Sequence, residues 1–446
     1  MINKAIQQDA RGNPMSACLP ETMDDFETAL YQFQSYFGDP TETLTRALER
    51  EPEFVMGHIF NACAMLMTSE REYLPMVRES IEAAEALAHK SNDREKALTA
   101  AARHWMEGRW DQACVTWDQV LGQYPRDAMA IQLGHLTDFY LGDATNLRDR
   151  VGRVIGSWDE STPGYSFILG MQAFGLEECN QFDRAEATAM KALSINPRDG
   201  WSVHAVAHVM EMQNRYEEGQ RFLRHRVDDW APDSGFAFHN WWHLALFYME
   251  QEDFATAIQL YDEQILLGDT EVSLEMCDAS ALLWRLQLQD VDVGERWNKI
   301  AELWANKTPG ENGYYAFNDL HAIIALVGAN RLQEARTVLD DLRLAVESNP
   351  RLTGMMAQYV GVPAACGIIA FAEQRYTDAV DALLPVRGHA ARFGGSNAQR
   401  DILSQTLIES AIRAGQAGLA RNLVGEREVH KPFSPLTKRF KAKLTH

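Results

Sequence analysis

Two pairs of histidines, each spaced four residues apart, are the strongest chemical signal in this sequence. His204 and His208 lie in "WSVHAVAHVMEMQ", and His239 and His243 lie in "FHNWWHLAL". Residues four apart on an α-helix share one face, so both rings of a pair can reach the same ion or ligand. Glu211 follows His208 by about one turn and adds a carboxylate that could act as a ligand or as a base.

Each pair belongs to a polar stripe that is rotated away from the small residue at which its helix is expected to pack. The first stripe holds Trp201, His204, His208 and Glu211, and the second holds His239, Trp242 and His243. Similar offsets in "CDASALLWRL" and "FNDLHAIIAL" carry Asp278, Arg285, Asn318, Asp319 and His321. If these helices stand side by side, their stripes form one polar wall of histidines, carboxylates, an arginine and tryptophans.

Three kinds of chemistry fit this wall. A divalent metal such as zinc could be held by His204, His208, His239 and His243. Histidines beside carboxylates could instead perform metal-free acid–base chemistry, or only bind a ligand. The sequence contains no H-E-x-x-H motif, so no known metalloenzyme signature supports the metal. Ligand binding is therefore favoured over catalysis, and no cofactor is assured.

A second polar motif, "GGSNAQRD" (residues 394–401), reads as a glycine turn that leads into a helix. Ser396 or Asn397 is expected to cap that helix. Gln399, Arg400 and Asp401 could then reach the polar wall near its end, where the Arg400 guanidinium can hold a carboxylate. A salt bridge to a neighbouring helix explains Arg400 equally well.

A repeat of about 34 residues determines the expected fold. "FDRAEATAMKALSINP" and "WDQACVTWDQVLGQYP" share an alanine and a proline at the same spacing. A small or apolar residue recurs twelve positions before each equivalent alanine or glycine, as in Ala173 and Ala185. This is the helix–turn–helix period of tetratricopeptide arrays. The sequence predicts an all-α tetratricopeptide-type superhelix of about ten helix pairs, over residues 20–425, between a polar segment 1–19 and a capping tail 426–446.

Composition restricts the partners and the compartment. The formal net charge of −21 opposes binding to nucleic acid and to anionic membranes. The six cysteines are scattered without a C-x-x-C motif, and the N-terminus shows no apolar stretch of signal length. No continuous apolar run of about 18 residues occurs, so no membrane span is expected. These features predict a cytoplasmic protein.

Several collinear stretches carry a resemblance to a known family. They include "FVMGH", "ALSINPRDGWSVHAVAHVMEM", "HNWWHLALF", "FNDLHA", "GGSNAQRD" and "SPLTKR", and they extend over nearly the whole chain. With these motifs the chain resembles a bacterial member of the tetratricopeptide repeat protein 38 family, the StaR-like group. The resemblance implies a helical repeat array and implies no agreed reaction.

The predicted function is therefore binding of a small molecule or short peptide in an enclosed concave groove lined by His, Asp, Glu, Trp and Arg. The alternative is a small-molecule hydrolase that uses His204, His208, Glu211, His239 and His243, with or without a metal. We expect the four histidine rings to lie within ~12 Å of one another. Glu211 and Asp278 should be their nearest carboxylates, and His321 could close the site. Oligomeric state is left open.

Overall fold

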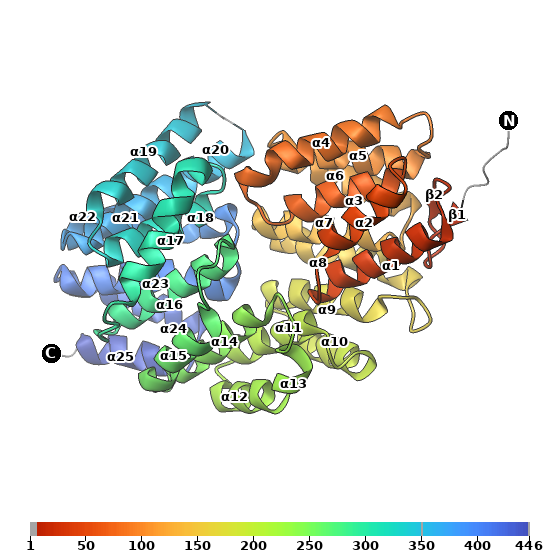
Figure 1. The fold of residues 1–446 in the computed structure, drawn as a ribbon. Helices are drawn as coiled ribbons and strands as arrows, with labels where there is room; N and C mark the ends of the chain where they lie inside the picture. The colour runs from red at the N-terminus through yellow and green to blue at the C-terminus, as the bar shows by residue number, and fades with distance from the viewer. Residues whose placement is uncertain (1–6, 349–350, 445–446) are drawn as a thin grey trace. The chain divides into compact units, whose positions relative to one another are not determined.

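The computed structural model describes residues 7–348 and 351–444 and is almost entirely helical in these residues (Figure 1). In chain order, eleven helix pairs run from α1–α2 to α23–α24, and the short helices α13 and α20 and the terminal helix α25 stand outside these pairs. The predicted fold class, an all-α solenoid of the tetratricopeptide type, is confirmed. Within the described residues the strands are limited to one two-residue hairpin, β1–β2.

The chain forms two compact units. The first comprises the chain up to Val206 together with Val227–Ala237, and the second comprises Ala207–Arg226 and the chain from Phe238 onward. Helix α11, Gly200–Met212, contributes its first half to one unit and its second half to the other.

The first unit contains β1 Gln7–Gln8, β2 Pro14–Met15, α1 Pro20–Ser35, α2 Pro40–Arg50, α3 Val55–Leu66, η1 Arg71–Tyr73, α4 Leu74–Ala86, α5 Asp93–Met106, α6 Trp110–Gln123, α7 Ala128–Tyr140, α8 Ala144–Val154, η2 Ile155–Ser157, α9 Tyr165–Glu178, α10 Phe182–Ile195 and α13 Val227–Trp230.

The second unit contains α12 Tyr216–His225, α14 Ala237–Glu250 from its second residue, α15 Phe254–Leu260, η3 Tyr261–Ile265, α16 Ser273–Leu288, α17 Arg296–Glu311, α18 Ala316–Gly328, α19 Leu332–Ser348, α20 Leu352–Met356, η4 Ala357–Gly361, α21 Val362–Ala372, α22 Tyr376–Leu383, η5 Val386–Gly388, η6 Ala390–Phe393, α23 Asn397–Arg413, α24 Ala417–His430 and α25 Pro435–Lys443.

The turns within nine consecutive pairs have the same geometry. The second residue after the first helix adopts a left-handed conformation, as Asn180 does at φ 59° after α9. The next amide then bonds the carbonyl five residues earlier, as Gln181 N–H bonds the Leu176 carbonyl at 2.9 Å. This Schellman closure satisfies carbonyls at the helix end and reverses the chain. The left-handed residues are Gly108, Gly142, Asn180, Asn214, Glu252, Asp290, Asn330, Gln374 and Gly415.

The repeat spacing follows from this turn. The first packing residue of a pair lies seven positions before the left-handed residue, and the second lies five positions after it, as Ala173 and Ala185 do around Asn180. Both alanines are fully buried. Where glycine takes the second position, at Gly219, an added Cβ would lie 2.4 Å from the Phe247 ring. The predicted register of the repeat is therefore confirmed at these helices.

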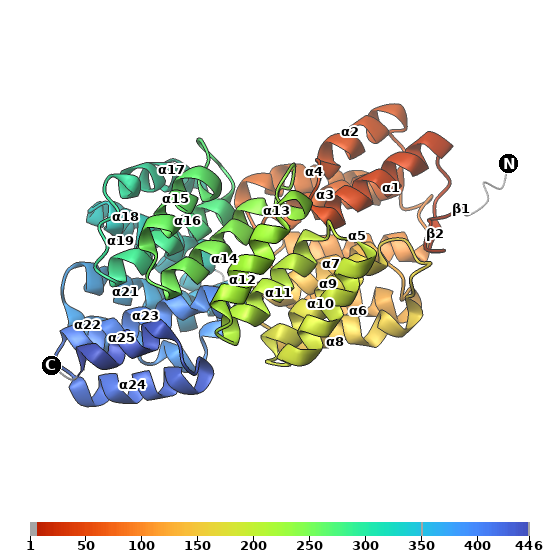
Figure 2. The same cartoon turned by 90° about the horizontal axis from the view of Figure 1, so that it is seen from below.

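Two features lie at the ends of the array. The hairpin β1–β2 falls inside the expected polar segment 1–19, and α1 begins at Pro20. At the other end, α25 packs against α23 and α24 (Figure 2). The Ser434 hydroxyl starts α25 by accepting a hydrogen bond from the Thr437 amide at 3.2 Å.

One helical stretch, Leu352–Ala372, is long and apolar enough to cross a membrane by length and composition alone. Of its most apolar window, 61% is buried inside the protein. A core helix has the same composition, so this stretch is weak evidence for a membrane span. The sequence contains no continuous apolar run of this length, because polar residues such as Gln358 interrupt it.

Candidate functional site

Three helices of the second unit position the polar residues predicted from the sequence. Helix α11 supplies His208 and Glu211, α14 supplies His239 and His243, and α16 supplies Asp278. The helical spacing of three and four residues turns both members of each pair toward one side of their helix. All five side chains are buried, with 0 to 4% of each residue exposed.

The rings of His208, His239 and His243 lie against one another. The ring centroids of His208 and His243 are 4.4 Å apart, and those of His239 and His243 are 4.9 Å apart. One ring nitrogen from each of the three lies within 4.8 Å of the others. The sequence-predicted convergence of His208 with the second histidine pair is thus present within this unit.

Two of these rings are each bonded to a carboxylate through Nδ1. His239 Nδ1 lies 2.6 Å from Asp278 Oδ2, and His243 Nδ1 lies 3.1 Å from Glu211 Oε2. An ionised carboxylate only accepts hydrogen bonds, so each Nδ1 carries the proton and donates it. In a neutral ring the Nε2 atom then holds the available lone pair. These are also the two carboxylates that the sequence placed nearest to the histidines.

The electrostatics at the Glu211–His243 pair favour an ionised carboxylate and a neutral ring. Burial raises the pKa of Glu211, but the Lys431 ammonium and the His243 ring outweigh it and hold that pKa below its usual range. Burial and the neighbouring His208 ring lower the pKa of His243 to about 3. His243 is therefore uncharged near neutral pH, as a metal ligand must be.

His204 belongs to the part of α11 in the first unit. Its ring lies in an aromatic cage there, with centroids 5.1 Å from Phe174, 5.0 Å from Trp201 and 5.2 Å from Phe236. Trp201 and His204 are both buried and do not line an open surface. The role of His204 as a fourth ligand stays a prediction.

Trp242 and Arg285 extend the second-unit cluster. The Trp242 ring stacks on His239 at 5.4 Å with an interplanar angle of 11°. The Arg285 guanidinium lies 5.3 Å from the centroid of the same indole, a cation–π contact. This chain of contacts joins the histidines to a cationic group on α16.

The remaining predicted site residues serve local structure. Asp319 accepts hydrogen bonds from the Gly313 amide at 3.2 Å, before α18. His321 bonds the Phe317 carbonyl one turn earlier at 2.8 Å. Asn318 lies beside Cys277, with Oδ1 3.7 Å from Sγ.

The motif "GGSNAQRD" also bonds mainly to itself. Ser396 is the cap of α23 and forms a reciprocal capping box with Gln399, as expected for this motif. Arg400 bonds the Gly395 carbonyl and the Asn397 side chain. The motif also reaches the pocket described next, because the Gln399 carbonyl accepts a bond from Arg285 at 3.1 Å and Asp401 lies in the pocket lining.

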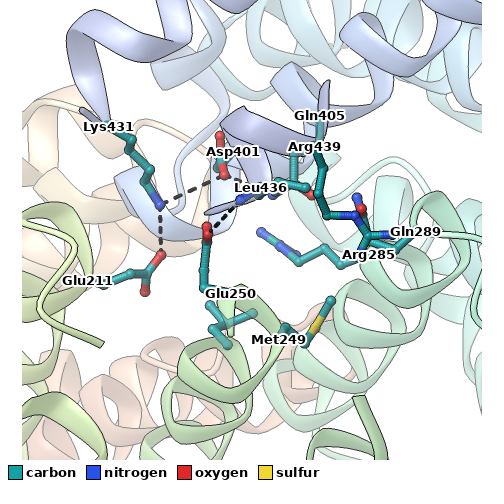
Figure 3. A pocket seen from close by; sticks show the side chains of 11 residues that line it. Glu211, Met249, Glu250, Arg285, Gln289, Asp401, Gln405, Lys431, Leu436 and Arg439 are labelled. Carbon is teal, nitrogen blue, oxygen red and sulfur yellow. Dashed lines mark hydrogen bonds and ion pairs between the residues drawn. The ribbon is translucent and has the colours of Figure 1, made fainter. Parts of the chain in front are cut away.

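A pocket next to the cluster contains residues that sequence reasoning missed (Figure 3). Lys431, from the end of α24, lies 3.1 Å from Glu211 and 3.8 Å from Asp401. Arg427 pairs with Asp401 and approaches Glu250 at 3.9 Å. Glu211 thus bonds the histidine cluster with one oxygen and the pocket ammonium with the other. The one sequence signal for this arrangement was the basic stretch "EREVHKPFSPLTKRFKAKLTH" at residues 426–446 of an otherwise acidic chain.

No protein-family model matches the chain. Similar solved structures include the human IFIT1 dimer with m7Gppp-AAAA, at 12% identity, with 99% of this chain and 96% of that chain covered and a TM-score of 0.41. The APC/C hetero-tetramer Cut9–Hcn1 gives 13% identity, coverage of 100% and 79%, and a TM-score of 0.45. Yeast Tom70 gives 13% identity, coverage of 95% and 86%, and a TM-score of 0.33.

All three TM-scores lie below 0.5, so these neighbours carry no argument about the ligand or the partner of this chain. The repeat fold stands on the helix pairs and turns described above. The exclusion of nucleic acid stands on net charge alone, and none of the comparisons supports it.

Proposed function

We propose that the second unit binds a divalent metal ion such as zinc through His208, His239 and His243, and holds a small ligand in the adjoining pocket. One observation carries the metal proposal: two of the three clustered rings are each backed by a buried carboxylate on Nδ1. This carboxylate–histidine arrangement is the usual support of metal-binding imidazoles, because it orients the ring and raises the basicity of Nε2.

The donor set suits zinc more than magnesium or calcium. Neutral imidazole nitrogens are preferred ligands of zinc, whereas the other two ions prefer oxygen. A tetrahedral ion with bonds of about 2.1 Å holds its ligand atoms about 3.4 Å apart. The three ring nitrogens already lie within 4.8 Å of one another, so binding requires only a small contraction. Three protein ligands leave the fourth position for His204, water or a ligand.

Elemental analysis of the purified chain tests this proposal. We expect about one zinc per chain after dialysis against buffer. His239→Ala and His243→Ala should each remove most of the metal, because each deletes a ligand. His204→Ala reports separately whether the first-unit histidine takes the fourth position.

His135→Ala is the matched control. His135 is a buried histidine of the first unit whose Nδ1 lies 3.3 Å from a backbone carbonyl, that of Leu147, and it should leave metal content unchanged. A chain that contains no metal, and takes up none after incubation with zinc, would overturn the metal proposal.

A small-molecule hydrolase is the second candidate. The position of Glu211 favours it, because this carboxylate lies between a clustered histidine and a polar pocket. A metal there would lower the pKa of a bound water, and a nearby carboxylate could take its proton. Turnover of ester or amide substrates that is lost in Glu211→Gln while metal content is retained would support catalysis. Metal binding without any turnover would leave the ligand-binding role.

Three broader assignments belong to the same proposal. The motif resemblance supports membership of the tetratricopeptide repeat protein 38 family, the StaR-like group. The polar, buried character of the pocket supports a small molecule or short peptide as its partner. The sparse, scattered cysteines support a cytoplasmic location.

A further inference from the structure

The pocket next to the histidine cluster has a cavity of about 30 Å³, room for about two water molecules or a few ligand atoms. Three cationic side chains, Arg285, Lys431 and Arg439, line it together with three carboxylates, Glu211, Glu250 and Asp401. The formal charges of this lining cancel, so its selectivity depends on which charges are already paired.

Arg285 is the pocket cation that no carboxylate pairs. Its Nη atoms bond three backbone carbonyls, those of Ala281 at 3.1 Å, Ala398 at 2.8 Å and Gln399 at 3.1 Å. Among the described residues no carboxylate lies within ion-pair distance of it, although only 2% of the residue is exposed. Three of its five donor hydrogens are used, so two remain for another acceptor.

Gln289 follows Arg285 by four residues and lines the same cavity. Both Oε1 and Nε2 of its amide are buried and have no hydrogen-bond partner within residues 7–348 and 351–444. Leaving a buried amide unsatisfied is costly, so such a group indicates an unseen partner. Its donor hydrogens and the spare donors of Arg285 come from one face of α16.

The other pocket charges are already matched. Lys431 pairs with Glu211 and Asp401, and Arg439 lies 3.7 Å from Glu252. Glu250 accepts bonds from the Ser434 hydroxyl at 3.0 Å and the Leu436 amide at 3.3 Å. A ligand that enters the cavity therefore meets one uncompensated positive charge and one unsatisfied amide.

We propose that this cavity is a receptor for a small carboxylate, which Arg285 and Gln289 hold together. A guanidinium and an amide N–H match the two oxygens of a carboxylate. The cavity volume of about 30 Å³ suits only a few atoms, which favours a small carboxylate over the bulkier phosphate. The inference rests on the proposed function, since it names the ligand class of the pocket beside the histidines.

Isothermal titration calorimetry with formate and acetate at low ionic strength tests the receptor. One site per chain is expected for formate, with at least tenfold weaker binding in Gln289→Leu and Arg285→Gln. Gln287→Leu is the matched control, because Gln287 lies on the same helix but bonds Trp297 at 2.9 Å and does not line the pocket. Formate affinity in that variant should stay within twofold of the original.

Gln289→Glu provides a test that does not depend on an added ligand. The new carboxylate would lie beside Arg285, mimic the ligand, raise the melting temperature and abolish formate binding. A lower melting temperature for this variant, or formate binding that survives in it, would overturn the receptor. Equal competition by phosphate would show a general anion site and would also overturn the carboxylate proposal.

Metal content measured on the same variants separates this inference from the metal centre. If these variants lose formate binding but retain zinc, the carboxylate site depends on Arg285 and Gln289 and is separate from the metal centre. If a chain without metal binds formate, the metal proposal is contradicted and the receptor proposal is supported.

Discussion

Buried charges are arranged differently in the two units of this chain. In the first unit, Arg94 lies 2.7 Å from Asp127, and Arg150 lies 2.7 Å from both Asp138 and Asp118. Each arginine pairs with carboxylates from other segments of the unit and so holds those segments together. In the second unit, buried Arg285 bonds only carbonyls beside a cavity. Arg94 and Arg150, like Arg427 of the second unit, therefore stabilise packing through ion pairs, whereas Arg285 stays available to a ligand.

The histidines repeat this contrast. His135 in the first unit and His321 in the second each bond a backbone carbonyl. His239 and His243 instead bond carboxylates and contact each other. Burial alone does not separate these two groups of histidines, whereas the acceptor at Nδ1, a backbone carbonyl or a carboxylate, does.

The largest expected effect concerns the buried ion pair of Arg94 and Asp127. Arg94→Met should destabilise the first unit by about 3–5 kcal/mol, because it leaves Asp127 buried without its cation. Arg285→Met should cost less, about 1–2 kcal/mol, since it strands carbonyls and no ion-paired carboxylate. Urea denaturation of both variants measures the difference. Equal losses of unfolding free energy in the two variants would contradict the distinction between the ion-paired Arg94 and the available Arg285.

The next prediction concerns acid stability. Burial, together with the neighbouring Arg285, lowers the pKa of His321 to about 4. The unfolded chain therefore takes up this proton first, and the stabilisation is complete above about pH 6.5 and lost as the pH falls toward 4. The loss should amount to about 3 kcal/mol.

Comparison with His321→Leu checks this value, since the variant lacks the titrating ring. Between pH 7 and pH 4 the unfolding free energy of the original chain should fall by about 3 kcal/mol more than that of the variant. His135, whose pKa burial lowers to about 3, should give the first unit the same behaviour at lower pH. Parallel pH profiles for the original chain and the variant would contradict the prediction.

Asp278→Asn sharpens the comparison between the two classes of histidine. Losing the charged acceptor of His239 Nδ1 should weaken zinc binding about 10- to 100-fold without removing a ligand. Asp319→Asn is the control, because this buried carboxylate of the same unit accepts a bond from the Gly313 amide at 3.2 Å. Competition with a chelating dye measures both affinities, and equal values for the two variants would argue for a polar wall without a metal.

Much of the fold follows from local rules that the sequence displays. Packing residues such as Ala173 and Ala185 are separated by twelve positions because seven residues precede the left-handed turn residue and five follow it. Glu211 and Asp278 were also predictable as partners of the histidines, because they share stripes on consecutive repeats.

The remaining part of the site depends on long-range packing. Lys431 meets Glu211 across 220 positions of sequence, and a periodic pattern contains no information about such a contact. The burial of His208, His239 and Arg285 also depends on such packing. Helical wheels identify the polar face of a helix but do not show whether later helices cover it.

The smallest expected effect concerns the left-handed residue of each turn, which differs in type from turn to turn. Gly108 and Gly142 supply the left-handed residue in two first-unit turns, whereas exposed Gln374 supplies it in the second unit at φ 60°. A residue with a Cβ pays about 1 kcal/mol in this conformation, and glycine does not. Gln374→Gly should therefore raise the unfolding free energy by about 0.5–1 kcal/mol, after the extra chain entropy of glycine is counted.

The reverse change in the first unit, Gly142→Ala, should lower stability by about 1 kcal/mol. Asn330→Gly is the neutral case, because asparagine tolerates the left-handed region better than glutamine does. Differential scanning calorimetry of the three variants gives the signs directly. If Gln374→Gly lowered the melting temperature, contacts of the glutamine side chain would outweigh backbone strain, and the nine turns could not be treated as equivalent.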